Sequence, residues 1–142
     1  MIWIGLDPGR STGFAVWDGR RRAFRDVATL PLHEALRRIH EILNDDPDEV
    51  AVVFEDARLR KWFPREKNAS DYRGKLMGAG SVKKDCAIIE DFCKDYGIAY
   101  EHPGPRVHMT KWDAEPFART TGYEGRTSEH GRDAALLVWG KR

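Results

Sequence analysis

Apolar runs near the N-terminus that end at turn residues predict the first strands of a sheet. Residues 2–7 carry bulky apolar side chains and end at Asp-Pro-Gly, which is typical of a strand that runs into a turn. Residues 12–17 predict a second strand, and Asp18-Gly19 predicts a two-residue hairpin that leads into a third strand over 23–30. The chain is therefore expected to open as an antiparallel β-meander.

Beyond the meander, helical periods alternate with short apolar runs. The all-apolar run at 50–54 suits a buried central strand, and a wide apolar stripe over 70–96 predicts a long helix. Pro116 would kink or shorten a helix in its region. The expected elements are a helix over 32–43, a strand over 50–54, a helix over 70–96, a strand over 98–101, a helix within 110–119 and a helix from 127 or 128 to 139. The predicted fold class is α/β, a β-meander followed by α-β-α-β-α, with a mixed five-stranded sheet and helices on both faces.

Composition is typical of one folded domain. The 142 residues are 41% hydrophobic and 33% charged, which is too apolar for a disordered chain and too polar for a membrane protein. No apolar run approaches the roughly 20 residues that span a bilayer, and residues 1–7 lack the basic leader of a secretory signal. Cys86 and Cys93 lie about 10 Å apart along one predicted helix, too far for a disulfide. We expect a single domain over 1–142, cytoplasmic and without a membrane partner.

The net charge of +1 conceals a strong separation of charge along the chain. Residues 34–56 hold eight acidic and two basic side chains, a local net charge of −6. Residues 57–84 hold nine basic and two acidic side chains, a local net charge of +7. A nearly neutral protein can therefore present a basic surface, although two ordinary solvated helix faces would have the same composition.

The basic stretch contains aromatic residues and indicates contact with nucleic acid. Basic side chains reach phosphates, and an aromatic ring can stack on an unpaired base or open a junction. Core packing beneath a loop is the alternative for Trp62 and Phe63. The predicted contacts in the loop are Arg58, Arg60, Lys61, Trp62, Phe63, Arg65 and Lys67, and those on the following helix are Lys75, Lys83 and Lys84.

Three carboxylates and one imidazole are candidates for chemistry. Asp7 ends the first strand, and Glu55 directly follows the central strand, where a charge is costly to bury without a partner. Strand alternation sends the side chain of Asp56 to the opposite face. His130 and Asp133 share one face of the last helix through their i,i+3 spacing. Turn capping for Asp7, and a satisfied helix-end pair for His130 and Asp133, are the structural alternatives.

Taken together, these groups indicate a metal site. Three carboxylates in one cleft cannot all remain ionised cheaply without cations. Oxygen-rich ligation with one histidine suits Mg²⁺ or Mn²⁺ better than a structural zinc. Two such ions about 3.5–4 Å apart are the arrangement that promotes in-line phosphodiester hydrolysis.

Four ordered motifs then resemble one family. Residues 7–16, Asp-Pro-Gly-Arg-Ser-Thr-Gly-Phe-Ala-Val, resemble the first-strand motif of the RuvC-type Holliday-junction resolvases, members of the ribonuclease H-like (retroviral integrase) superfamily. Val-Phe-Glu at 53–55 resembles the family's fourth strand with its catalytic glutamate. Residues 67–80 are similar to its loop and long helix, and residues 130–135 resemble its final helix.

The resemblance implies a role for each candidate. Asp7, Glu55 and Asp133 carry over as catalytic, metal-binding carboxylates, and His130 takes a position where family members have Asp or His. Lys111 matches a basic position that contacts the junction. The segment 103–110 is short and lacks the Gly-rich basic insertion of the bacterial enzymes, which favours a phage or mobile-element member in a host cytoplasm.

The activity implied by the resemblance is Mg²⁺-dependent endonuclease cleavage of four-way DNA junctions, with two ions per site and Mn²⁺ able to substitute. Paired symmetric nicks would leave 5′-phosphate and 3′-hydroxyl ends, as DNA recombination and repair require. Two opposed cuts need two active sites, so we expect a C2 homodimer through the helix 70–96, where Gly74 and Gly78 allow close approach. The alternatives are a nuclease for other branched, flapped or RNA-containing duplexes, a non-catalytic nucleic-acid-binding module, and an ATP-binding domain of the actin and sugar-kinase type.

Overall fold

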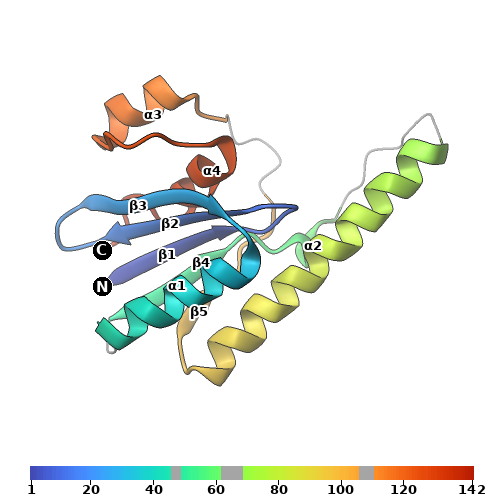
Figure 1. Cartoon of the computed structure of the whole chain (residues 1–142), viewed down its shortest axis with the longest axis horizontal. Helices are drawn as coiled ribbons and strands as arrows, with labels where there is room; N and C mark the ends of the chain where they lie inside the picture. The colour runs from blue at the N-terminus through green and yellow to red at the C-terminus, as the bar shows by residue number, and fades with distance from the viewer. Residues whose placement is uncertain (46–48, 62–68, 106–110) are drawn as a thin grey trace.

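A mixed five-stranded sheet forms the centre of the molecule (Figure 1). The computed structural model describes the chain from 1 to 142 except residues 46–48, 62–68 and 106–110. The strands are β1 (Ile2–Asp7), β2 (Thr12–Asp18), β3 (Ala23–Leu30), β4 (Val50–Phe54) and β5 (Ala99–Glu101). Their order across the sheet is β3-β2-β1-β4-β5, with β1, β2 and β3 antiparallel and β4 and β5 parallel to β1. The predicted mixed α/β sheet is confirmed.

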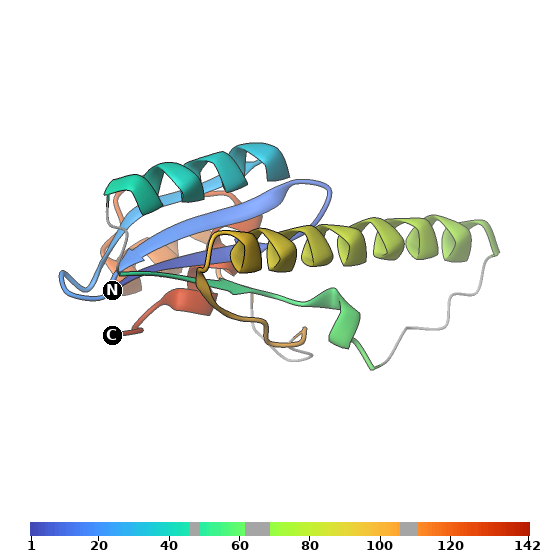
Figure 2. The same cartoon turned by 90° about the horizontal axis from the view of Figure 1, so that it is seen from below.

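Helices cover both faces of this sheet (Figures 1 and 2). The helices are α1 (Leu32–Asp45), the short 3₁₀ helix η1 (Ala57–Leu59), α2 (Ala69–Asp95), α3 (Ala114–Thr121) and α4 (Glu129–Val138). Helices α1 and α2 pack on one face through side chains such as Ile39 and Ile89. Helix α4 packs on the other face together with Phe117 of α3. The predicted order of elements is therefore found in full.

Strand alternation divides the core between the two faces. Val52 and Phe54 of β4 belong to the cluster beneath α1 and α2, whereas Val53 belongs to the cluster beneath α4. The next two residues continue this alternation, so Glu55 is expected on the α4 side and Asp56 on the α2 side.

Two glycines allow α4 to approach the sheet closely. A Cβ atom at Gly13 would overlap the backbone carbonyl of His130, and one at Gly5 would overlap that of Ala134. Any larger residue at these positions would displace α4 from β1 and β2. The glycines thus determine how near the last helix lies to the end of β1.

Two local predictions need correction. Asp18 pairs with Ala23, so the turn between β2 and β3 has four residues rather than the two predicted from Asp18-Gly19. The Asp18 carboxylate accepts hydrogen bonds from the backbone amides of Arg20 and Arg21, at 3.0 and 2.9 Å, which closes the longer turn. Helix α3 begins only at Ala114, which places Pro116 in the first turn, where its missing N–H is tolerated.

Helix α2 extends well beyond the sheet (Figure 2). Its C-terminal half buries Ile89 and the two cysteines Cys86 and Cys93, which are unbridged as predicted. Its N-terminal half leaves the side chains of Leu76 and Met77 47% and 79% exposed. Among the described helices, none combines the length and apolar character that crossing a membrane requires.

Candidate active site

Strand β1 and helix α4 bring Asp7, His130 and Asp133 together. Each offers one ligand atom, and these three atoms lie within 4.8 Å of one another. His130 Nδ1 lies 3.3 Å from Asp7 Oδ2, within hydrogen-bond distance. Ser128 caps α4 by accepting a hydrogen bond of 3.1 Å from the Gly131 amide, which fixes the turn that carries His130. Residues 123 positions apart in the sequence thus form one compact cluster.

The electrostatics of this cluster favour a cation. Burial raises the pKa of the Asp7 carboxyl, the nearby Asp133 carboxylate raises it further, and the His130 hydrogen bond opposes both effects. Burial also raises the pKa of Asp133, and the positive charge of Lys111 counteracts this. Two partly buried carboxylates that resist ionisation together have the chemistry of a divalent metal site.

Glu55 lies beside this cluster but does not belong to it. It follows β4, whose end is adjacent to the end of β1, and its amide donates a hydrogen bond of 3.2 Å to the Leu6 carbonyl. Among the described residues, the group whose ligand atoms lie within 4.8 Å comprises Asp7, His130 and Asp133 without Glu55. The structure therefore groups three of the four predicted site residues and places the fourth at the neighbouring strand end.

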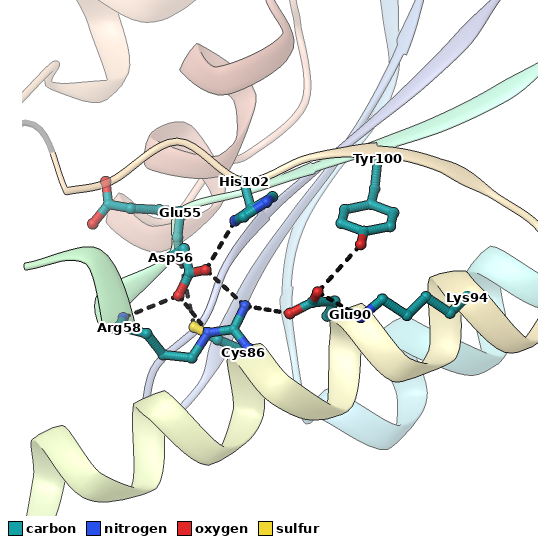
Figure 3. A network of polar contacts seen from close by, with 8 residues as sticks. All are labelled: Glu55, Asp56, Arg58, Cys86, Glu90, Lys94, Tyr100 and His102. Atoms are coloured by element: carbon teal, nitrogen blue, oxygen red, sulfur yellow. Dashed lines mark hydrogen bonds and ion pairs between the residues drawn. The ribbon is translucent and has the colours of Figure 1, made fainter.

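Asp56 points away from Glu55 into a separate polar network (Figure 3). Its carboxylate accepts hydrogen bonds from Arg58 Nε and Nη2, at 2.8 and 2.7 Å, and lies 3.1 Å from His102 Nδ1. Arg58 Nη2 also donates to Glu90 of α2 at 2.6 Å. The hydrogen bond from Arg58 is the main cause that lowers the pKa of Asp56 to about 2, so this carboxylate is ionised at neutral pH.

The predicted DNA contacts have different surroundings. Arg58 is held between two carboxylates, so its guanidinium acts within the protein rather than as an open phosphate contact. Lys111 forms an ion pair with Glu129, in the first turn of α4. Arg60, Lys61, Lys75 and Lys84 are exposed, and Lys83 is half-buried. Trp62, Phe63, Arg65 and Lys67 lie outside the described residues.

Sequence reasoning missed most of the Asp56 network. Alternation along β4 correctly separates Asp56 from Glu55, but its partners come from η1, from α2 and from the residue after β5. Nothing in the spacing of Arg58, Glu90 and His102 indicates their proximity. Only the burial of a carboxylate next to a strand end signals that such partners must exist.

Comparisons with known proteins support the fold. A scan of protein-family models and a search of curated proteins each find no match. A solved structure of T. thermophilus RuvC in complex with Holliday junction substrate is similar, with a TM-score of 0.61 and 18% sequence identity. The match covers 99% of this chain and 92% of that chain. The chain therefore has the ribonuclease H-like α/β fold that its sequence motifs predicted.

Proposed function

We propose that this protein is a metal-dependent, structure-specific endonuclease that resolves four-way DNA junctions by paired symmetric cuts. One observation carries the proposal: Asp7, His130 and Asp133 converge at the end of the central strand of a ribonuclease H-like fold. The similarity to a resolvase bound to its junction, over nearly the whole of both chains, supports the same activity. The proposal contains a general activity, hydrolysis of nucleic acid, and a narrower one, the resolution of four-way junctions.

The donor set fits Mg²⁺ or Mn²⁺. Carboxylate oxygens with one imidazole are hard ligands, and both grouped carboxylates are partly buried where an unpaired negative charge is unfavourable. Asp7, Glu55 and Asp133 would hold the ions, and His130 would bind an ion or orient a water molecule. Bound ions would activate water and stabilise the charge on the leaving 3′ oxygen, leaving 5′-phosphate and 3′-hydroxyl ends.

The protein itself orients the metal ligands. The contact between His130 Nδ1 and Asp7 Oδ2 orients the imidazole, so its other nitrogen is available for an ion or for a water molecule. The backbone bond from Glu55 to Leu6 keeps the two strand ends in register. Both features bring ligands to one place before DNA arrives.

DNA would approach over the basic surface that begins after β4. We assign phosphate contacts to Arg60, Lys61, Lys75, Lys83 and Lys84. We assign stacking to Trp62 and Phe63, and further phosphate contacts to Arg65 and Lys67. Lys111, paired with Glu129 near the metal ligands, would contact the backbone close to the cut. Such contacts would make binding strongly dependent on salt.

A second copy of the chain would supply the second cut. The exposed apolar side chains of α2 suit a helix-to-helix contact in a C2 dimer. So do its glycines 74, 78 and 80, where an added Cβ would meet no described residue outside the local turns of the helix within 4 Å. The dimer places two equivalent sites on a two-fold symmetric junction.

One experiment tests the proposal. Wild type and Asp7→Asn are incubated with end-labelled four-way junction, flap, RNA–DNA hybrid and linear duplex, with Mg²⁺ or with EDTA. We expect paired symmetric nicks on the junction alone, absent in EDTA and in Asp7→Asn although the variant still binds the junction. Cleavage that persists in Asp7→Asn with EDTA would refute the metal site.

The same experiment decides between the alternatives. Cutting confined to flaps or hybrids would assign the fold to another branched substrate. Binding without cleavage of any substrate in Mg²⁺ or Mn²⁺ would indicate a non-catalytic nucleic-acid-binding module.

A further inference from the structure

We propose that the network of Asp56, Arg58 and Glu90 positions Glu55, and so raises the affinity of the active site for its metal ions. Asp56, Arg58 and Glu90 are positioning residues, since their network reaches α2, which packs on the opposite face of the sheet from α4. Figure 3 shows this network. The inference rests on the proposed function and assigns to this network a role that packing alone does not require.

Asp56 is a buried carboxylate whose oxygens are both hydrogen-bonded. Its exposed fraction is only 1%, and the guanidinium of Arg58 pairs with it at 2.7 Å. The carboxylate is satisfied by the Arg58 amide at 3.0 Å, by two guanidinium nitrogens and by the His102 ring. A buried carboxylate that is bonded on both oxygens is held firmly in place, because separating it from the Arg58 guanidinium would leave an uncompensated buried charge.

The network then connects the Asp56 carboxylate to α2 and to the segment of β5. Glu90 of α2 accepts from Arg58 Nη2 at 2.6 Å, from Lys94 at 2.7 Å and from the Tyr100 hydroxyl of β5 at 3.2 Å. The His102 ring stacks on Phe54, the last residue of β4, with ring centroids 5.8 Å apart. The turn after β4 is therefore held by α2 on one side and by the β5 segment on the other.

Glu55 is held within this turn by its backbone. Its N–H donates to the Leu6 carbonyl at 3.2 Å, and its own carbonyl lies 3.6 Å from the thiol of Cys86, one helical turn before Glu90 on α2. The next amide, of Asp56, donates to the Pro103 carbonyl at 2.8 Å. Because the backbone groups on both sides of Glu55 are bonded, the peptide cannot rotate freely. The direction of the Glu55 side chain, opposite to that of Asp56, is thereby maintained (Figure 3).

A pre-positioned carboxylate binds a cation more tightly than a mobile one. Residues that orient metal ligands typically change metal affinity or activity by about 10–100-fold when they are replaced. Loss of the Asp56 charge would release Arg58 and loosen the turn that carries Glu55. The expected result is weaker metal binding that a higher metal concentration overcomes.

The chain offers a matched control at the other end of the sheet. Asp18 is also a buried aspartate at a strand end, caps two backbone amides, and pairs with Arg25 at 2.8 Å. It lies opposite Ile2, at the end of β1 remote from Asp7. Asp18→Asn should therefore reduce stability as Asp56→Asn does, without an effect on metal binding.

The experiment compares wild type, Asp56→Asn, Glu90→Gln and Asp18→Asn. Mn²⁺ affinity is measured by calorimetry without DNA, junction cleavage is titrated with Mn²⁺, and hydrogen exchange is followed in the peptide over 50–61. For Asp56→Asn we expect an Mn²⁺ dissociation constant about tenfold higher, restoration of the cleavage rate at saturating Mn²⁺, and faster exchange. Glu90→Gln should show the same changes to a smaller extent.

Each outcome has one meaning. Unchanged Mn²⁺ affinity and exchange in Asp56→Asn, or an equal loss of affinity in Asp18→Asn, would overturn the positioning role. If the wild type binds Mn²⁺ but cuts no DNA, the nuclease proposal is refuted. The comparison of Mn²⁺ affinities would then still decide whether the network positions Glu55. If wild type binds no Mn²⁺, the proposed function fails, and unchanged exchange in Asp56→Asn would overturn the positioning of Glu55 as well.

Discussion

The carboxylates of Asp7 and Asp133 are unfavourable to the fold when no cation is bound. Burial raises the pKa of both groups above the ordinary value of 3.8, so the folded chain holds their protons more tightly than the unfolded chain does. Burial thus makes ionisation of either carboxyl less favourable in the folded chain than in the unfolded chain. Their contribution to stability therefore improves as pH falls through the raised pKa values and is lost again as pH rises.

Asp7→Asn should accordingly stabilise the metal-free protein while removing its activity. We expect a higher free energy of unfolding in EDTA at pH 7, because the amide is neutral and removes a charge next to Asp133. We also expect junction cleavage to fall by roughly 10³-fold or more, since metal ions supply several kcal/mol of transition-state stabilisation. Urea titration and a cleavage assay measure the two effects. Asp91→Asn, at an exposed position of α2, is the control and should change neither.

Asp56 should have the opposite pH dependence. Its pKa is lowered to about 2 from 3.8, mainly by the Arg58 hydrogen bond, so its stabilising effect is present above the ordinary value and is lost as pH falls towards 2. Asp56→Asn should cost about 2 kcal/mol of unfolding free energy at pH 7, and roughly half of that at pH 3. Urea titrations at the two pH values provide the test. An equal loss of unfolding free energy at both pH values would show that Asp56 contributes through its shape and not through its charge.

At the scale of elements, local pattern was sufficient to predict the fold. Apolar runs that end at turn residues identified the meander, and the all-apolar run at 50–54 identified the interior strand β4, because strands buried on both faces need no polar positions. The turn after Asp18 was predicted two residues too short, since its real closure depends on side-chain hydrogen bonds to Arg20 and Arg21. Local propensity does not include such bonds.

The candidate site was predictable only where it depends on strand and helix ends. Asp7 and the His130–Asp133 pair follow from the end of a strand and from one helix face, and the structure groups them. The separation of Asp56 from Glu55 follows from alternation. The partners of Asp56 could not be predicted, because Arg58 and Glu90 meet only after α2 packs on the sheet. The same packing explains why Arg58, which was predicted to contact DNA, is engaged within the protein.

The approach of α4 to the sheet makes a prediction for Gly13. A Cβ atom there would overlap the carbonyl of His130, and backbone cannot move aside without shifting the helix. Gly13→Ala should therefore destabilise the protein by roughly 1–3 kcal/mol and weaken Mn²⁺ binding, since His130 and Asp133 move with α4. Thermal unfolding and calorimetry measure both.

Gly78→Ala is the matched control for this substitution. Among the described residues, no atom outside the surrounding turns of α2 lies within 4 Å of the added methyl group, and Gly78 is in the exposed half of α2. Alanine should stabilise the helix of a single copy by about 0.5–1 kcal/mol and leave Mn²⁺ binding unchanged. If Gly13→Ala bound Mn²⁺ as wild type does, α4 would not depend on the glycine for its position.

At the scale of the whole molecule, the near-zero net charge results from two separate uses of charge. Part of the acidic stretch is neutralised locally, as in the pairs of Glu49 with Arg20 and of Glu41 with Arg37. The basic stretch begins with Arg58, which is internally paired, and continues through exposed residues such as Arg60 and Lys61. The charges that we propose for metal binding and for DNA binding can thus lie on neighbouring surfaces without cancelling each other.

The projecting half of α2 provides the last prediction, which concerns assembly. Leu76 is 47% exposed on α2, and Leu59 on η1 is 48% exposed, so the two leucines are matched in exposure but differ in their relation to the proposed dimer contact. Leu76→Gln should shift the protein towards a monomer in light scattering at micromolar concentration, because it removes apolar area from a symmetric contact twice. Leu59→Gln should leave the mass unchanged.

The cleavage pattern should change with the oligomeric state of the protein. A monomeric Leu76→Gln variant keeps Asp7, His130 and Asp133, so Mn²⁺ binding should persist while paired incision gives way to single, unlinked nicks on the junction. Resolution of a supercoiled cruciform plasmid distinguishes these products, since one nick yields open circles and two linked nicks yield linear DNA. Wild-type mass together with unimpaired paired incision in Leu76→Gln would place the dimer contact elsewhere on the molecule, because a contact through the exposed half of α2 cannot tolerate that change on both copies.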